Sequence, residues 1–214
     1  MLKGSVLEVA YYRFLGKYLV PCCIFLRLKP DHLSLLGMLS GLGAGIAFVF
    51  TPFWGGMLTF LTGLLDTLDG ALARKLNQTR RQGAFLDSVL DRYTELFILA
   101  GIWGYFYRRG SATPLIALTI FLVLFGSLMV SYVRARAEGL SASCSVGLFQ
   151  RGERIISIGL GGMVNSFCNF TARANEAAIL GQDAVLIVVL ILLAVGTNLT
   201  ALWRLVHVLN KLRP

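Results

Sequence analysis

The stretch LLDTLDGALARKLNQTRRQGAFLDSVLDRYTE, Leu64 to Glu95, places four aspartates in a chain that is otherwise largely apolar. Asp66 and Asp69 are three residues apart, so they share one face of a helix. Asp87 and Asp91, four residues apart, do the same on the next predicted helix. A charge at the centre of a membrane helix costs about 2.5–3.5 kcal/mol on insertion scales, and neighbouring anions also repel one another. The pattern therefore predicts a bound cation, and oxygen ligands favour Mg²⁺, Mn²⁺ or Ca²⁺.

The composition around this stretch is that of a membrane protein. Of the 214 residues, 56% are hydrophobic and only 14% are charged, and the mean hydropathy is +0.71. Soluble domains carry about 25% charged residues, and a helix needs about 20 apolar residues to cross a bilayer. Four stretches without a charged residue suit membrane helices: Leu33–Leu65, Gly110–Val133, Ile155–Ala172 and Ala184–Trp203.

These stretches predict an all-α integral membrane protein with six transmembrane helices. The first stretch is long enough for two helices, and Thr51-Pro52 divides it because proline interrupts a helix. A sixth span, about Gly83 to Tyr107, contains the second aspartate pair. We expect one six-helix domain over residues 30–214. Residues 1–29 mix aromatic and basic side chains, which predicts an N-terminal juxtamembrane amphipathic segment lying at the membrane interface.

The basic residues predict the orientation. Most of the 20 Lys and Arg residues fall at the N-terminus, in Arg74–Arg81, in Arg134–Arg154 and at the C-terminus. An even number of spans puts these segments on one side, and positive residues mark the cytoplasm. We therefore expect a multi-pass protein of the cytoplasmic membrane, with both termini and the active site facing the cytoplasm. The net charge of +9 suits anionic lipids or substrates. The basic residues lie at the expected membrane edges, which argues against a nucleic-acid partner.

The residues between the aspartate pairs favour a bound phosphate. Gly70 and Ala73 leave room for a ligand, and Arg74 offers a planar fork of donors. Four carboxylates suffice for two ions, and metals about 3.5–4 Å apart clamp a phosphoryl group. A divalent-cation transporter is the alternative of another class. Cation transport, however, leaves Gly70, Ala73, Arg74 and Gly83 unexplained.

The pattern Asp66-x2-Asp69-Gly70-x2-Ala73-Arg74-x8-Gly83-x3-Asp87-x3-Asp91 resembles the signature of the CDP-alcohol phosphatidyltransferase family at every specified position. The resemblance implies a phospholipid-synthesising enzyme that transfers a lipid phosphoryl group from a CDP-linked lipid to a hydroxyl and releases CMP. It also implies that two Mg²⁺ or Mn²⁺ ions are held by the four aspartates. Asp91 would in addition be the general base.

The same resemblance implies the CDP-lipid site. Its expected residues are Gly70, Ala73, Arg74, Gly83 and the element Lys29-Pro30-Asp31-His32 at the mouth of the first span. Some relatives carry Ser or Thr three residues before the signature's glycine, where this chain has Arg80. Either Arg80 or Thr79 is expected to contact the nucleotide. The lipid itself is either CDP-diacylglycerol or an archaeal ether analogue.

Three arginines predict a site for a phosphorylated polyol acceptor. Arg134, Arg154 and Arg204 each lie at a cytoplasmic helix end, where they can make charge-assisted contacts with a phosphate, although orientation alone also requires basic residues there. Their segments resemble those of phosphatidylinositol phosphate synthases, which implies inositol 1-phosphate as acceptor. Gly152 and Trp203 depart from that subgroup without removing a charge. Glycerol 3-phosphate and serine stay as alternative acceptors.

The first span also contains a ladder of small residues, Gly37, Gly41 and Gly45. Such a ladder lets two helices approach closely. It serves either as the seam of a homodimer or as a packing surface within one chain.

Overall fold

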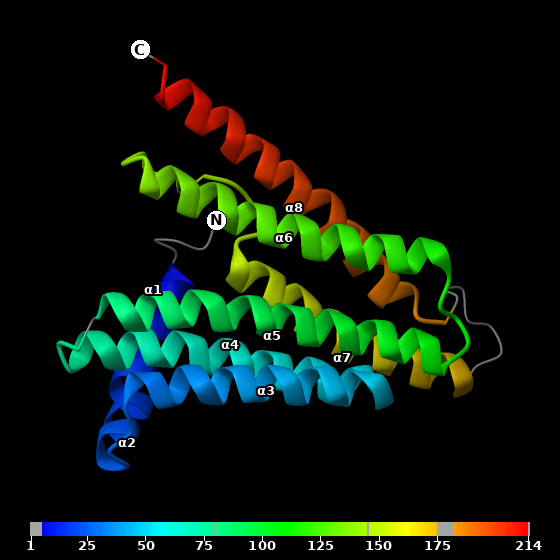
Figure 1. The fold of residues 1–214 in the computed structure, drawn as a ribbon. Coiled ribbons are helices and arrows are strands. Elements are labelled where there is room, and N and C mark those ends of the chain that lie inside the picture. Colours follow the sequence, from blue (N-terminus) through cyan, green and yellow to red (C-terminus); the bar gives the residue numbers. More distant parts are fainter. Residues whose placement is uncertain (1–5, 79, 145, 175–181, 214) are drawn as a thin grey trace.

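The fold is a bundle of helices (Figure 1). The computed structural model describes residues 6–78, 80–144, 146–174 and 182–213. Its long helices are α3 (Pro30–Phe50), α4 (Pro52–Lys75), α5 (Arg81–Arg108), α6 (Pro114–Gly139), α7 (Arg151–Ala174) and α8 (Ala184–Lys211). Thr79 is outside the described residues, so its predicted contact with a nucleotide stays a prediction.

The break between α3 and α4 lies where the sequence predicts it, at Thr51-Pro52. Thr51 is extended, with φ −154° and ψ 125°, and Pro52 begins α4. Proline is suited to the first position of a helix because its missing N–H has no partner there in any case, and Pro30 and Pro114 occupy the same position in α3 and α6. In the part of the chain that the structure describes, α3, α6 and α8 are long and apolar enough to cross a membrane.

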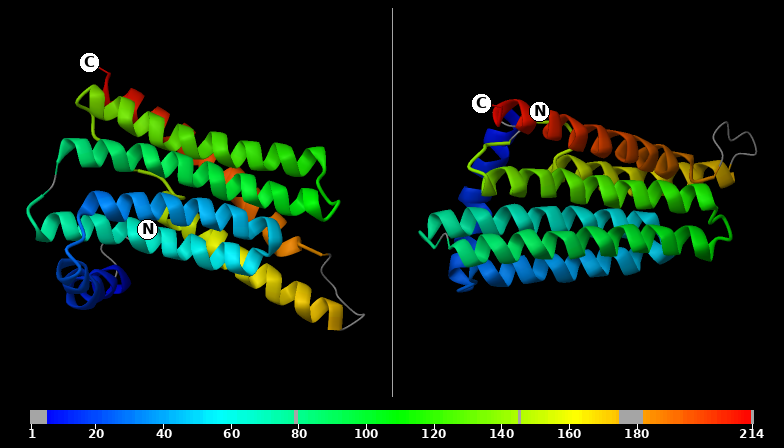
Figure 2. Two further views of the ribbon diagram at one scale, coloured as in Figure 1. Left: turned by 60° about the horizontal axis from the view of Figure 1, so that its bottom comes forward. Right: turned by 45° about the horizontal axis from the view of Figure 1, so that its top comes forward.

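Two groups of helices make up the bundle (Figures 1 and 2). Helix α3 packs against both α4 and α5, and α6 packs against α8. Helix α7 contacts α4 on one side and α8 on the other, so it joins the two groups. The first residues of α3, α5 and α7 and the last residues of α4, α6 and α8 consequently gather towards one end of the bundle.

The glycine ladder packs within the chain. A Cβ atom at Gly41 would collide with the side chain of Thr94, and one at Gly45 would collide with the backbone of Phe97 on α5. The ladder therefore allows α3 and α5 to approach backbone to backbone, which confirms the intrachain alternative for these glycines.

A buried polar network closes the opposite end of the bundle. The carboxylate of Asp183, before the first residue of α8, is 3% exposed. It accepts hydrogen bonds from Tyr105 Oη at 2.6 Å, Asn165 Nδ2 at 2.9 Å and Asn169 Nδ2 at 2.6 Å, and Arg109 Nε lies 3.4 Å away. Because buried polar groups need partners, this network fixes α5, α7 and α8 relative to one another.

The N-terminal segment lies across the other end of the bundle (Figure 1). It consists of α1 (Val6–Phe14), a π-helical turn (Leu15–Leu19) and α2 (Val20–Phe25). Leu15 and Val20 are buried in one cluster with Leu68 and Leu72 of α4. Aromatic side chains on the other face are exposed: Phe14, Tyr18 and Phe25. The segment thus has apolar side chains packed against α4 and aromatic side chains left exposed.

Candidate active site

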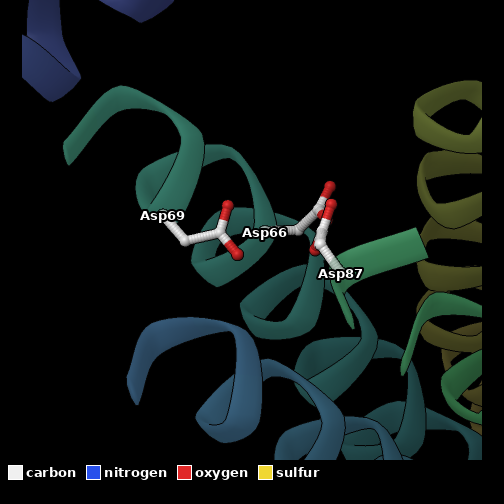
Figure 3. Close-up of side chains that lie close together, drawn as sticks. All are labelled: Asp66, Asp69 and Asp87. Carbon is white, nitrogen blue, oxygen red and sulfur yellow. The ribbon is translucent and has the colours of Figure 1, made fainter. Parts of the chain in front are cut away.

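Three of the four signature aspartates converge. Asp66 and Asp69 lie on the C-terminal half of α4, and Asp87 lies near the start of α5. Each offers a carboxylate oxygen within 4.8 Å of the others. In Figure 3 the carboxylates of Asp66 and Asp87 lie next to each other and that of Asp69 turns towards them. The i, i+3 spacing on α4 puts two acids on one face, and the short connection to α5 brings the third.

Asp69 is held by a residue that the sequence did not single out. Ser34 Oγ on α3 donates a hydrogen bond to Asp69 Oδ2 at 2.6 Å, and Asp69 is only 5% exposed. A hydrogen bond of this kind orients a carboxylate and leaves its other oxygen for a ligand. Ser34 lies four residues after Pro30, but α3 contains a second serine, Ser40, so the sequence alone carried no signal for Ser34.

Asp91 lies beside the three aspartates and has a different partner. It lines the same cavity as Asp66, Asp69 and Asp87. One oxygen, Oδ1, accepts from Arg151 Nη2 at 2.6 Å, while Arg151 Nη1 forms an ion pair with Asp66 Oδ1. The guanidinium of Arg151 therefore bridges two of the expected metal ligands. The sequence pattern pointed to Arg154, three residues later, and not to Arg151.

The donor set fits a hard divalent cation. The converging atoms are carboxylate oxygens, which Mg²⁺ and Mn²⁺ prefer. Two of the three aspartates are partly exposed and the third is buried, so water can complete a coordination shell on one side only. The residues present could hold a divalent metal ion, and a second ion would need Asp91.

The residues predicted to contact the CDP-lipid gather around the start of α3, the end of α4 and the start of α5. A Cβ atom at Gly83 would lie 3.6 Å from Asp31 Oδ1, and one at Gly70 would lie 3.4 Å from Arg74 Nη1. The backbone N–H of Lys29 donates to Nδ1 of His32 at 3.4 Å across the start of α3. The remaining predicted contacts are Pro30, which begins α3, Ala73 on α4, and Arg80, which is exposed just before α5.

Arg74 also borders a groove between the N-terminal segment and α4. Its guanidinium lies 5.8 Å from the centroid of the Tyr12 ring. The groove has a volume of about 630 Å³ and is lined by Tyr12, Gly16, Val20, Ala71, Arg74 and Lys75. Its lining is mostly apolar, with two cations at the α4 side, which suits a ligand that has both an anionic and an apolar part.

The three arginines predicted to bind the acceptor lie in one neighbourhood. Arg134 and Arg154 are both close enough to Arg204 to act on it electrostatically. Arg154, 2% exposed, donates to Glu95 Oε1 at 2.7 Å and to Phe149 O at 3.0 Å.

The side chain of Arg204 is also buried and hydrogen-bonded within the protein. It is 4% exposed and donates to the carbonyls of Val146 at 2.8 Å and Val130 at 2.7 Å. Arg134 is exposed, and its side chain pairs with Glu138 at 2.8 Å. Arg154 and Arg204 therefore hold the loop before α7 in place through its backbone carbonyls. The sequence did not predict these partners.

The chain resembles known proteins over most of its length. The model of the CDP-alcohol phosphatidyltransferase family matches residues 27–207. The chain is 35% identical over 215 residues to the phosphatidylinositol phosphate synthase of Streptomyces avermitilis, covering 96% of this chain and 84% of that one. It is 39% identical over 143 residues to the archaetidylinositol phosphate synthase of Methanothermobacter thermautotrophicus, covering 66% and 70%.

Solved structures show the same fold. The phosphatidylinositol phosphate synthase of Mycobacterium tuberculosis with CDP-DAG bound superposes with a TM-score of 0.76 at 25% identity, over 92% of this chain and 94% of that one. The same protein in complex with manganese and citrate gives a TM-score of 0.74 at 26% identity, over 91% and 88%.

Proposed function

The chain belongs to the CDP-alcohol phosphatidyltransferase family, and we propose that it transfers the phosphatidyl group of a CDP-linked lipid to inositol 1-phosphate, releasing CMP. The observation that carries the proposal is the convergence of Asp66, Asp69 and Asp87, with Arg151 of α7 paired to Asp66. This is a membrane transferase of phospholipid synthesis, so the cation-transporter alternative is set aside. Support for the acceptor comes from the relatives, which are named as inositol phosphate synthases.

We propose two Mg²⁺ or Mn²⁺ ions, held by Asp66, Asp69, Asp87 and Asp91. Ions at this place would neutralise the charge that builds up on the pyrophosphate in the transition state. Ser34 keeps Asp69 oriented for this role. A solved relative contains manganese, which supports the choice of a divalent ion.

The residues of the chain supply the remaining steps. Asp91 takes the proton from the acceptor hydroxyl while the oxygen of that hydroxyl attacks the β-phosphorus of the CDP-lipid. A new oxygen–phosphorus bond forms, the bond to the CMP oxygen breaks, and CMP leaves with the electron pair. Arg74 is the proposed cation for the diphosphate, at the edge of the apolar groove, and the element from Lys29 to His32 with Gly83 and Arg80 borders the nucleotide.

The acceptor phosphate is assigned to Arg134, Arg154 and Arg204. Arg134 is exposed and would exchange its ion pair with Glu138 for a phosphate, while Arg154 and Arg204 already point donors towards the loop before α7. Charged donors of this kind favour a phosphorylated acceptor over serine. Glycerol 3-phosphate has the same phosphate chemistry and is therefore the competing acceptor.

We also propose the topology that the basic residues indicate. All six long helices cross the cytoplasmic membrane as one domain over residues 30–214, and both termini and the active site face the cytoplasm. Residues 1–29 lie at the interface, with the exposed rings of Phe14, Tyr18 and Phe25 towards the lipid. The CDP-lipid then reaches the groove beside Arg74 from the plane of the bilayer.

An acceptor panel tests the proposal. The purified protein in lipid or detergent is given CDP-diacylglycerol and Mn²⁺, and CMP release is measured with inositol 1-phosphate, glycerol 3-phosphate, serine or free inositol. Inositol 1-phosphate should be turned over fastest, and free inositol and serine poorly. Equal rates with free inositol would show that the arginines bind no acceptor phosphate, and an archaeal ether-linked CDP-lipid in a parallel series identifies the donor.

A further inference from the structure

Arg151 lies where a cation is expected. It is the first residue of α7, and its two terminal nitrogens bind Asp66 on α4 and Asp91 on α5. It lines the cavity that contains all four aspartates. Its side chain is 21% exposed and those of Asp66 and Asp91 are 25% and 13% exposed, so solvent reaches the bridge.

The bridge divides the aspartates into two sets that share Asp66. One set is Asp66, Asp69 and Asp87, whose oxygens lie within 4.8 Å of one another without any contribution from Asp91. The other set is Asp66 with Asp91, and the guanidinium occupies the space between these two carboxylates. An ion that used Asp91 as a ligand would compete with Arg151 for the same oxygens.

The charges in the cavity agree with this division. When all four aspartates are ionised, as metal ligands are, they carry four negative charges. Arg151 and Arg92, whose Nη1 lies 3.7 Å from Asp91 Oδ2, supply two positive ones. The remaining two negative charges balance one divalent ion and leave none for a second. A second ion becomes favourable when the charge of Arg151 is withdrawn from Asp66 and Asp91.

We infer that Arg151 is a tethered counter-cation: a first metal ion binds at Asp66, Asp69 and Asp87, and a second binds at Asp91 only when the guanidinium of Arg151 moves away. The inference rests on the proposed function, because it needs divalent ions at the aspartates. The two ions then bind with different affinities, the first at Asp66, Asp69 and Asp87 and the second at Asp91 in exchange for Arg151.

The surroundings of Arg151 allow it to leave. Residues 146–150 before it are irregular, so the side chain emerges at a helix start and not from the middle of a packed helix. Arg154, three residues later, shows the contrast. It is 2% exposed and is bonded to Glu95 and to the carbonyl of Phe149, which holds the first turn of α7 in place while Arg151 moves.

Manganese binding to the protein without substrates tests this inference. Free Mn²⁺ is measured by electron paramagnetic resonance during titration of the purified wild type, Arg151→Gln and Arg92→Gln. The wild type should show one tight and one weak site. In Arg151→Gln the weak site should tighten by at least about tenfold, which corresponds to about 1.4 kcal/mol, because the competing cation is gone.

Arg92→Gln is the matched control. It removes one positive charge beside the same Asp91, but Arg92 does not bridge to Asp66, so the weak site should tighten much less. Arg151→Lys adds a second comparison, since an ammonium keeps the charge but lacks the fork that reaches two carboxylates. Its weak site should lie between those of the wild type and Arg151→Gln.

Thermal unfolding gives a second measurement that does not depend on activity. Without metal, Arg151→Gln should unfold at a lower temperature than the wild type, because one of the two positive charges that offset the repulsion among the aspartates is gone. Saturating Mn²⁺ should raise its unfolding temperature by more than that of the wild type, which also shows that the variant is folded.

Each outcome decides between explanations. Two equal Mn²⁺ sites in the wild type, or an unchanged weak site in Arg151→Gln, would overturn the role of Arg151 while leaving the proposed function intact. The same gain in Arg92→Gln would show general electrostatics without displacement, and would overturn it as well. A wild type that binds no Mn²⁺ would refute the metal site of the proposed function itself.

Discussion

The hydrogen bond from Ser34 to Asp69 offers a sharp test of how α3 contributes to the site. Ser34 Oγ donates to Asp69 Oδ2 at 2.6 Å, and Asp69 is 5% exposed, so water cannot easily replace the lost donor in Ser34→Ala. A hydrogen bond to a charged group contributes about 1.5–3 kcal/mol. Loss of the partner that orients a metal ligand typically lowers metal affinity about 10- to 100-fold. We expect the Mn²⁺ concentration for half-maximal activity to rise by that factor.

The assay is CMP release at saturating CDP-lipid and acceptor over a range of Mn²⁺ concentrations. Ser40→Ala is the matched control, because it makes the same change on the same helix. Ser40 Oγ donates to the carbonyl of Leu58 at 3.3 Å and accepts from Thr62 at 3.2 Å, and neither bond involves a carboxylate. Ser34→Thr, which keeps the hydroxyl, should restore much of the affinity. A wild-type metal dependence in Ser34→Ala would refute the view that this hydrogen bond positions a metal ligand.

The remaining predictions concern the aspartates and the acceptor arginines. Asp66→Asn and Asp87→Asn should each abolish turnover, because each removes a ligand charge. Chelation by EDTA should inactivate the wild type until Mg²⁺ or Mn²⁺ is added. Near-normal CMP release in either variant would argue against the metal site. Asp91→Asn should lower kcat by about 10²–10⁴-fold with little change in CDP-lipid binding, which is measured by filter binding. An equal loss of CDP-lipid binding would show that Asp91 acts mainly as a metal ligand and that another residue is the general base. Arg134→Gln should raise KM for inositol 1-phosphate about tenfold or more and leave KM for the CDP-lipid unchanged. Because Arg134 is exposed, the unfolding temperature of this variant should stay near that of the wild type. An unchanged KM for the acceptor would make this arginine a marker of topology only.

Local patterns in the sequence were sufficient for the helices and for the acidic centre. Proline cannot continue a helix interior, so the division between α3 and α4 at Pro52 followed from a single residue. The spacing of Asp66 and Asp69 put both acids on one helix face whatever the helix packs against. The signature that runs from Asp66 to Asp91 identified the family before any contact between helices was known.

Contacts between helices were decided only by the tertiary structure. The sequence placed Arg151 at a membrane edge, but nothing local indicates that its two nitrogens reach acids on two other helices. The first two spans contain several serines and threonines, and only the packing of α3 against α4 distinguishes Ser34, because it brings Ser34 to Asp69. Helical periodicity states which residues share a face, while the choice of the facing helix depends on close packing, such as the contact of Gly45 with the backbone of Phe97.

The same distinction separates the four aspartates. Their spacing predicts that all four face a common centre, and three of them do come within 4.8 Å of one another. Asp91 lies one helical turn after Asp87 on α5 and is nearer to the start of α7, so its charge is balanced by Arg151. The sequence by itself determined which residues carry the charge, and the approach of α7 to α4 and α5 decided which of those charges already has a partner, because a buried carboxylate takes the cation that packing brings within reach.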